Sequence, residues 1–148
     1  MQTAGQDLTL EEYRELAEFR YQISERGRRC ERAAQEMGIR SNLYLLLLTV
    51  QGLPEGALPT MTTLAQRMCL PPMTMSALVD EAAGQVLVTR SSNMGDGTDW
   101  IKLTRAGRET LHRITIAVRE DLEMAGPDLA CALQAVIRQR RKKGRKVA

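Results

Sequence analysis

The stretch TMTTLAQRMCLPPMTMSALVDEAAGQVLVTRSSNMGDGTDWIKLT, residues 60–104, decides the fold. Apolar residues recur at helical spacing twice, over residues 64–69 and again over residues 75–82. Leu70-Pro71-Pro72 separates the two runs, because proline cannot continue a helix but fits well into a helix's first turn. The pattern predicts two short helices joined by a tight turn.

After Gly84 the apolar period falls from about 3.6 residues to 2, which is the period of a β-strand. Residues 86–90 and 99–104 are therefore predicted strands. Residues 91–98, which contain Gly95-Asp96-Gly97, are suited to the tip of a hairpin between them. Helix, turn, helix and hairpin, in this order, are typical of a winged helix-turn-helix.

This stretch resembles the MarR family of bacterial transcription regulators. The matching segments are residues 64–68, 70–76, 78–80, 87–90, 96–97 and 103–107. The last of these matches the family's Leu-Thr-x-x-Gly pattern after the wing. The resemblance implies that residues 72–83 form the recognition helix and that the hairpin is the wing.

The flanking segments complete a fold that is mainly α, with six helices and a small antiparallel β wing. Thr9 and Glu12 form a capping box at the start of a long helix that ends before Gly38. The predicted elements that follow are a helix at 42–51, a short third strand at 58–60, a helix at 104–125, and a last helix after the break at Gly126-Pro127. Gly144 should end the last helix.

We expect one domain over residues 1–148, because a chain of this length suits one core. Long helices cannot bury their full apolar stripes against so small a lobe, so another long element or a second copy should cover them. By resemblance, residues 40–104 are the winged lobe, and residues 9–38 and 105–143 are the dimerisation helices. Residues 144–148 form a basic tail.

If Met75, Val79 and Ala82 point inward, other residues of the same helix lie on or near its outer face. The candidate DNA contacts are Met73, Thr74, Ser76 and Ala77 on that helix, together with Thr62, Arg90, Asn93 and Thr98. The hydroxyls of Thr74 and Ser76 suit phosphates or bases, whereas Met73 and Ala77 suit thymine methyl groups. Arg90 is expected to pair with Asp80 and brace the wing, as similar residues do in the family.

The chain also departs from the family. The family commonly has a polar residue where this chain has Met73, and arginines in place of Ala77, Glu81 and Thr98. Glu81 would be repelled by phosphate. The alternative is therefore a winged-helix dimer with weak or lost specific DNA binding, which acts in protein interaction or in ligand or redox sensing.

The formal net charge is +3, with 21 basic and 18 acidic residues. Seven of the basic residues lie after Ile137, so the rest of the chain is acidic overall. This basic end could contact phosphates, solubilise the chain or bind an acidic partner. The apolar run at 43–50 is too short to span a membrane, and residues 1–8 lack a signal-peptide pattern. We expect a cytoplasmic protein that does not bind a membrane.

Small-molecule and redox sites are weaker hypotheses. Because MarR relatives often bind phenolic or anionic compounds, the resemblance implies an effector site with polar candidates Tyr13, Arg20, Tyr44 and His112. Cys30 is a candidate redox thiol because arginines surround it in sequence. The three cysteines have no metal-ligand spacing, and nothing resembles a nucleophile–base pair, so no metal, cofactor or catalytic residue is expected.

These features together predict a DNA-binding transcription regulator that is not an enzyme. The resemblance makes it a homodimer, more often a repressor than an activator, whose partner is double-stranded DNA. A two-fold dimer would place its recognition helices about 34 Å apart and read a pseudo-palindromic operator. An effector would act by favouring one spacing of the two lobes over another.

Overall fold

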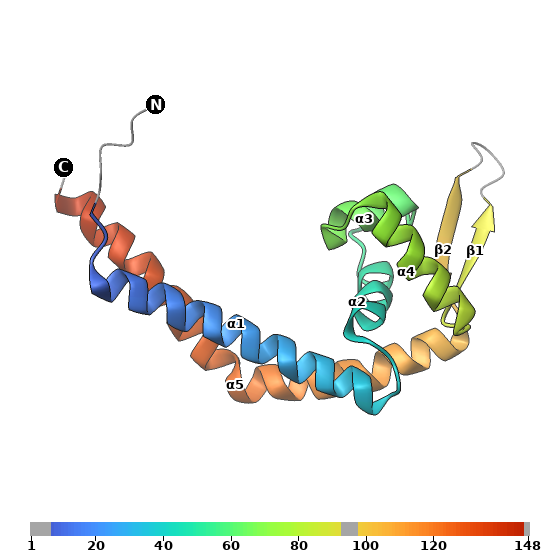
Figure 1. Cartoon of the computed structure of the whole chain (residues 1–148), viewed down its shortest axis with the longest axis horizontal. Helices are drawn as coiled ribbons and strands as arrows, with labels where there is room; N and C mark the ends of the chain where they lie inside the picture. Colours follow the sequence, from blue (N-terminus) through green and yellow to red (C-terminus); the bar gives the residue numbers. More distant parts are fainter. Residues whose placement is uncertain (1–6, 93–97, 147–148) are drawn as a thin grey trace. The chain divides into compact units, whose positions relative to one another are not determined.

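The computed structural model describes residues 7–92 and 98–146. Their elements, in order, are α1 (Leu10–Glu36), α2 (Ser41–Gln51), α3 (Met61–Met68), α4 (Pro72–Gly84), β1 (Val88–Ser92), β2 (Asp99–Leu103) and α5 (Arg105–Lys146) (Figure 1). The fold is mainly α with a two-stranded antiparallel sheet, which confirms the predicted fold class.

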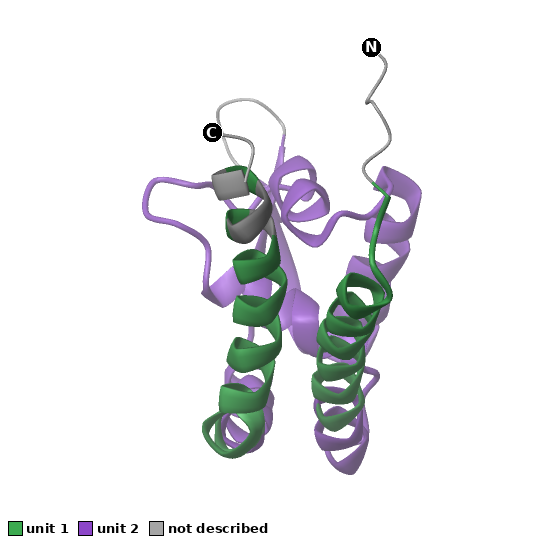
Figure 2. Cartoon of the chain, turned by 90° about the vertical axis from the view of Figure 1, so that its left-hand side faces the viewer, with its two compact units in different colours: residues 1–29, 118–148 green, residues 30–117 purple. Residues whose placement is uncertain are grey.

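The chain forms two compact units (Figure 2). We call residues 30–117 the head unit and residues 1–29 with 118–148 the arm unit. The predicted lobe of residues 40–104 lies entirely within the head unit. Helices α1 and α5 each contribute residues to both units.

The head unit is built around one side of α2. Leu43, Tyr44, Leu46 and Leu47 are almost completely buried, and α3, α4 and β2 all contact this helix. The other side of α2 stays in contact with solvent, since Leu45 and Leu48 are each 40% exposed. The run of apolar residues in α2 therefore extends beyond the buried face of the helix.

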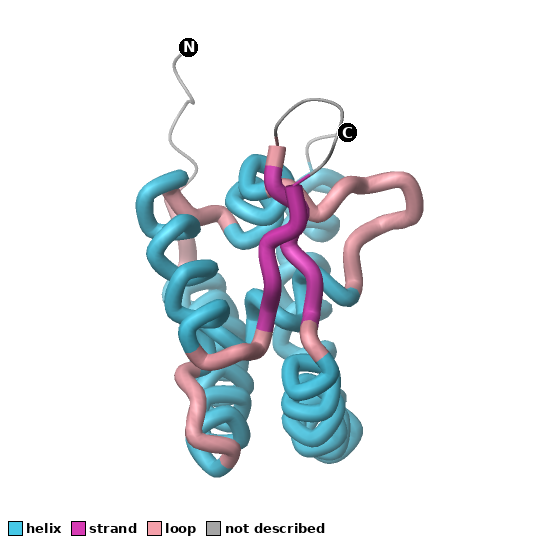
Figure 3. Tube along the Cα trace, turned by 90° about the vertical axis from the view of Figure 1, so that its right-hand side faces the viewer, coloured by secondary structure: helices cyan, strands magenta, loops and turns pink. Residues whose placement is uncertain are grey.

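The hairpin follows the predicted pairing with one change at its start. β1 and β2 are antiparallel, with Val88 opposite Leu103 and Ser92 opposite Asp99 (Figure 3). The predicted third strand is reduced to a single bridge between Thr60 and Trp100. These contacts place the hairpin beside α3 and α4 in the head unit.

The prediction that β1 begins at Val86 was wrong. Val86 has a left-handed backbone (φ 59°), and the amide of Leu87 donates to the carbonyl of Ala82 at 2.9 Å. The chain therefore closes the end of α4 before it extends, and pairing starts two residues later. A period-2 pattern alone does not reveal this turn, because residues of the turn can also be apolar.

The start of α5 is tied to this turn by Thr104. Its hydroxyl donates to the carbonyl of Val86 at 2.6 Å and accepts from the amide of Gly107 at 3.0 Å, so it caps the helix. A Cβ at Gly107 would lie 2.0 Å from the carbonyl oxygen of Leu87. The Thr-x-x-Gly pattern thus has a physical cause here: the threonine caps α5 and the glycine lets the backbone approach.

We expect Gly107→Ala to destabilise the protein by about 3 kcal/mol, because the new methyl group would displace a backbone carbonyl. Thermal and urea unfolding followed by circular dichroism would measure the change. Gly84→Ala is the matched control, because its Cβ would meet no atom within 4 Å. The control should change stability by less than about 1 kcal/mol. Equal stability of the two variants would contradict the close approach.

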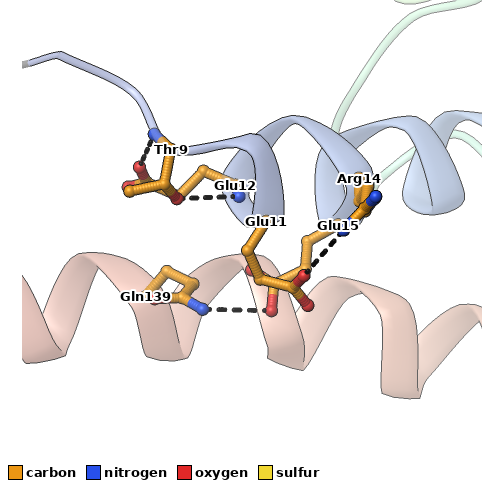
Figure 4. A network of polar contacts seen from close by, with 6 residues as sticks. All are labelled: Thr9, Glu11, Glu12, Arg14, Glu15 and Gln139. Carbon is orange, nitrogen blue, oxygen red and sulfur yellow. Dashed lines mark hydrogen bonds and ion pairs between the residues drawn. The ribbon is translucent and has the colours of Figure 1, made fainter.

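In the arm unit, polar contacts link α1 to α5. The amide nitrogen of Gln139 donates to Glu15 at 3.1 Å, and Arg26 pairs with Asp121 at 3.3 Å (Figure 4 shows the first contact). At the start of α1, the carboxylate of Glu12 accepts from the backbone amide of Thr9 at 2.7 Å, and the hydroxyl of Thr9 accepts from the backbone amide of Glu12 at 3.2 Å. The predicted capping box is therefore confirmed.

The predicted break at Gly126-Pro127 is wrong, because α5 continues through both residues to Lys146. The steric clash that usually ends a helix before proline involves the Cβ of the preceding residue, and Gly126 has none. Polar contacts with α1 are found on either side of Pro127, at Asp121 and at Gln139. Five helices are therefore observed among the described residues where six were predicted, and Gly144 does not end the last one.

None of the helices in the described ranges combines the length and apolar character needed to cross a membrane. The same ranges contain no group of three or more His, Cys, Asp or Glu side chains that could hold a metal ion.

Candidate nucleic-acid interface

The helix-turn-helix is formed by local capping and a tight turn. Thr60 caps α3, because its side-chain hydroxyl accepts from the amide of Thr63 at 3.3 Å. Cys69 then takes a left-handed conformation (φ 54°) that ends α3. Pro72 occupies the first turn of α4, where a missing amide proton costs nothing.

Helix α4 has a buried face and an outer face, as predicted. Met75, Val79 and Ala82 are completely buried and pack toward α2, α3 and β1. On the opposite side, Met73 is 86% exposed. Thr74 and Ala77 are also exposed, whereas Ser76 is half-buried. The inner residues thus fix the rotation of α4 and leave these side chains to face solvent.

Both carboxylates of α4 are paired with arginines from other elements. Asp80 accepts from Arg90 of β1, which is the brace that the sequence predicted. Glu81 accepts from Arg40, which lies just before α2, through two contacts, one of them at 3.0 Å. The hydrogen bond from Arg40 lowers the pKa of Glu81 below its usual value, and the same contact raises the pKa of Arg40. Both negative charges on α4 are therefore compensated within the head unit.

Arg40 is a residue beside α4 that sequence reasoning did not single out. It lies 41 residues before Glu81, and no short-range pattern connects the two positions. Only the packing of α2 against α4 brings them together. The expectation that Glu81 repels phosphate needs a correction, because the carboxylate is not free in this structure.

The remaining predicted DNA contacts are dispersed around α4. Thr62 is exposed on α3, and Thr98 is exposed just before β2. Arg90 is engaged with Asp80, and Asn93 lies outside the described residues. The α4 residues and Arg90 are the ones that the structure brings together in one place.

The effector candidates lie in different surroundings. Tyr44 is buried in the head unit, where its hydroxyl lies 3.2 Å from the hydroxyl of Thr115 and burial raises its pKa. His112 is exposed and lines a hollow of about 310 Å³ together with Leu48, Gln51, Arg108, Leu111 and Thr115. Tyr13 and Arg20 are exposed on α1 in the arm unit.

Cys30 is half-buried, and burial raises the pKa of its thiol. This direction is opposite to that of a sensor cysteine, which must be held as a thiolate. Of the nearby arginines, Arg26 pairs with Asp121 and Arg28 pairs with Glu25. Cys69 and Cys131 are both exposed.

We expect Cys69 and Cys131 to react with a thiol reagent at least about tenfold faster than Cys30 at neutral pH, because exposure and thiolate content control the rate. Timed alkylation followed by mass spectrometry of peptides would measure the three rates. Unfolded protein is the control, in which all three thiols should react alike. A Cys30 that reacts fastest in the folded protein would revive the redox hypothesis.

Known structures share this fold. The chain is similar to AbsC, a MarR family transcriptional regulator from Streptomyces coelicolor, with 19% identity, a TM-score of 0.75, and coverage of 96% of this chain and 99% of AbsC. It is also similar to the apo form of MarR from E. coli, with 16% identity, a TM-score of 0.66, and coverage of 93% and 98%.

A third similar structure is a MepR mutant from S. aureus bound to an oligodeoxyribonucleotide. It has 18% identity, a TM-score of 0.61, and coverage of 95% of this chain and 99% of MepR. No protein-family model matches the sequence, and no curated protein matches it. The comparisons establish that the chain has the winged helix-turn-helix fold of MarR-type regulators, as the sequence predicted.

Proposed function

We propose that this protein is a MarR-type transcription regulator that binds double-stranded DNA as a homodimer and acts as a repressor at a pseudo-palindromic operator. Structures with this fold include E. coli MarR with operator DNA and the MepR complex. Helix α4 would enter the major groove, and the hairpin would lie along the adjacent groove. The residues of this chain that would contact DNA lie mainly on α4.

The observation that carries the proposal is the charge compensation on α4. DNA would repel a helix with two free carboxylates. Proteins bind DNA largely because their positive charges neutralise its phosphates. Here Arg90 and Arg40 compensate Asp80 and Glu81, so the outer face of α4 can approach a phosphate backbone. The same arrangement leaves Met73, Thr74 and Ala77 uncovered for contact with base edges.

Exposed apolar side chains on the arm unit support a homodimer. They are Leu8, Leu10, Tyr13, Leu16, Tyr21, Ile23, Leu122, Met124, Leu133 and Ile137. So many large apolar groups on α1, α5 and the residues just before α1 are more than an isolated soluble surface usually carries. A second copy of the same helices would bury them and would set two heads at a fixed spacing on the DNA.

The hollow beside α5 supports an effector of phenolic or anionic type. It is lined by Leu48 and Leu111 on its apolar side, and by Arg108 and His112, which can donate hydrogen bonds to an anion. A compound bound there would contact α5 and α2, and α2 packs against α4. Its effect on DNA affinity would follow from stabilising one arrangement of the heads.

The decisive experiment is selection of bound duplexes from a random pool by the full-length protein, followed by titration with the enriched sequence. We expect an enriched two-fold symmetric site, with half-sites about one helical turn apart, bound by two copies of the chain. Mass photometry would count the chains. Binding without sequence preference, or no binding, would favour the alternative of an interaction or sensing module.

We expect Arg40→Ala to weaken DNA binding about fivefold, because it frees the Glu81 carboxylate beside the DNA, and one such charge is worth about 1 kcal/mol near water. Fluorescence anisotropy at about 0.1 M salt would measure affinity. Adding Glu81→Gln to the Arg40→Ala variant should restore most of the loss.

Arg119→Ala is the control for this pair, because it removes an equal charge from an exposed ion pair with Glu123 in the arm unit. Affinity should change by less than about twofold in this variant. If the Arg40→Ala, Glu81→Gln double variant remained as weak as Arg40→Ala, Arg40 would contact phosphate directly, and its role in compensating Glu81 would be rejected.

A further inference from the structure

The first half of α4 presents an apolar outer surface. Met73 is 86% exposed and Ala77, four residues later, is exposed as well, so the two side chains lie one above the other on one side of the helix. Thr74 adds a hydroxyl beside them. Exposure of this degree is unusual for a methionine in a helix that buries four other residues.

The side chains that usually read bases through hydrogen bonds are missing from this helix. α4 contains no Arg, Lys, Asn, Gln or His, which are the residues that make paired contacts with guanine and adenine. Asp80 and Glu81 could accept a hydrogen bond from cytosine, but both are engaged by arginines. The strongest remaining means of base discrimination on α4 is apolar contact.

Thymine offers the matching feature. Its C5-methyl group is the apolar group that an unmodified base pair projects into the major groove. A methionine side chain is flexible and polarizable, so it can adapt to such a group. The first residues of a recognition helix are those that contact base edges, and Met73 is the second residue of α4.

We propose that α4 selects its DNA site by apolar contact between Met73, supported by Ala77, and the C5-methyl groups of thymines. This inference rests on the proposed DNA-binding function. It commits the protein to duplex DNA, since an RNA duplex lacks this methyl group and has a major groove too narrow for side chains to read. Met73 is then the residue that determines specificity, and phosphate contacts only position the helix.

The test uses the duplex enriched by the full-length protein and replaces its thymines with deoxyuridine, one position at a time. This change removes one methyl group and leaves every hydrogen-bonding atom in place. We expect at least one position in each half-site where affinity falls about fourfold, which corresponds to burial of a single methyl-sized group. Fluorescence anisotropy titrations would measure each affinity.

The Met73→Ala variant should bind the thymine and deoxyuridine duplexes equally, because the contact that senses the methyl group has been removed. Since Met73 is exposed, the variant should fold normally, which circular dichroism would check. Leu58→Ala is the matched control, because Leu58 is an apolar residue that is 49% exposed but lies in the loop before α3, outside α4 and outside the proposed dimer surface. This control should keep the full ratio between the two duplexes.

Two results would overturn the inference while leaving the proposed function intact. One is specific binding of wild-type protein with no position sensitive to loss of a methyl group. The other is a methyl-dependent ratio that persists in Met73→Ala. Failure to enrich any duplex would be a different result, because it would reject the proposed function and, with it, the inference.

Discussion

Burial of one side of α2 is the constraint on which the head unit depends. Leu43, Leu46 and Leu47 have almost no contact with solvent, and the helix touches α3, α4 and β2. Each of these elements is too short to be stable alone, since an isolated helix of eight to thirteen residues is marginal in water. Their apolar faces therefore fold only together, against α2.

This packing also sets the chemistry of the surface. Once Met75, Val79 and Ala82 are buried, the rotation of α4 about its axis is fixed, and Met73 and Ala77 must face outward. The same packing brings Arg40, which lies just before α2, close to the C-terminal end of α4, where its side chain pairs with Glu81. One apolar core thus produces both an exposed apolar surface at Met73 and Ala77 and the ion pair that compensates Glu81.

Two residues of the Leu-Thr-x-x-Gly pattern contribute to this fold, although the sequence identity to the similar structures is low. Thr104 and Gly107 act through backbone geometry, because one caps α5 and the other permits contact with the carbonyl of Leu87. Residues on the outer face of α4 have no such duty. They are free to differ, and this chain has Met73 and Ala77 there.

Much of the fold could be read from local patterns. Helical spacing in α3 and α4, the prolines between them, the capping box at Thr9 and the strand period all reflect interactions within a few residues. The Asp80–Arg90 pair came from family resemblance, and the exposed Met73 from the position of Met75. In each case a short stretch of sequence contains the physical cause.

Other features required contacts between distant segments. Helix α5 continues through Pro127 and contacts α1 on both sides of the proline, and the carbonyl of Val86 accepts a hydrogen bond from the hydroxyl of Thr104. The pairing of Arg40 with Glu81 spans 41 residues. Periodicity and capping describe how a segment interacts with itself, whereas these three features arise only when buried apolar faces bring separate segments within hydrogen-bonding distance.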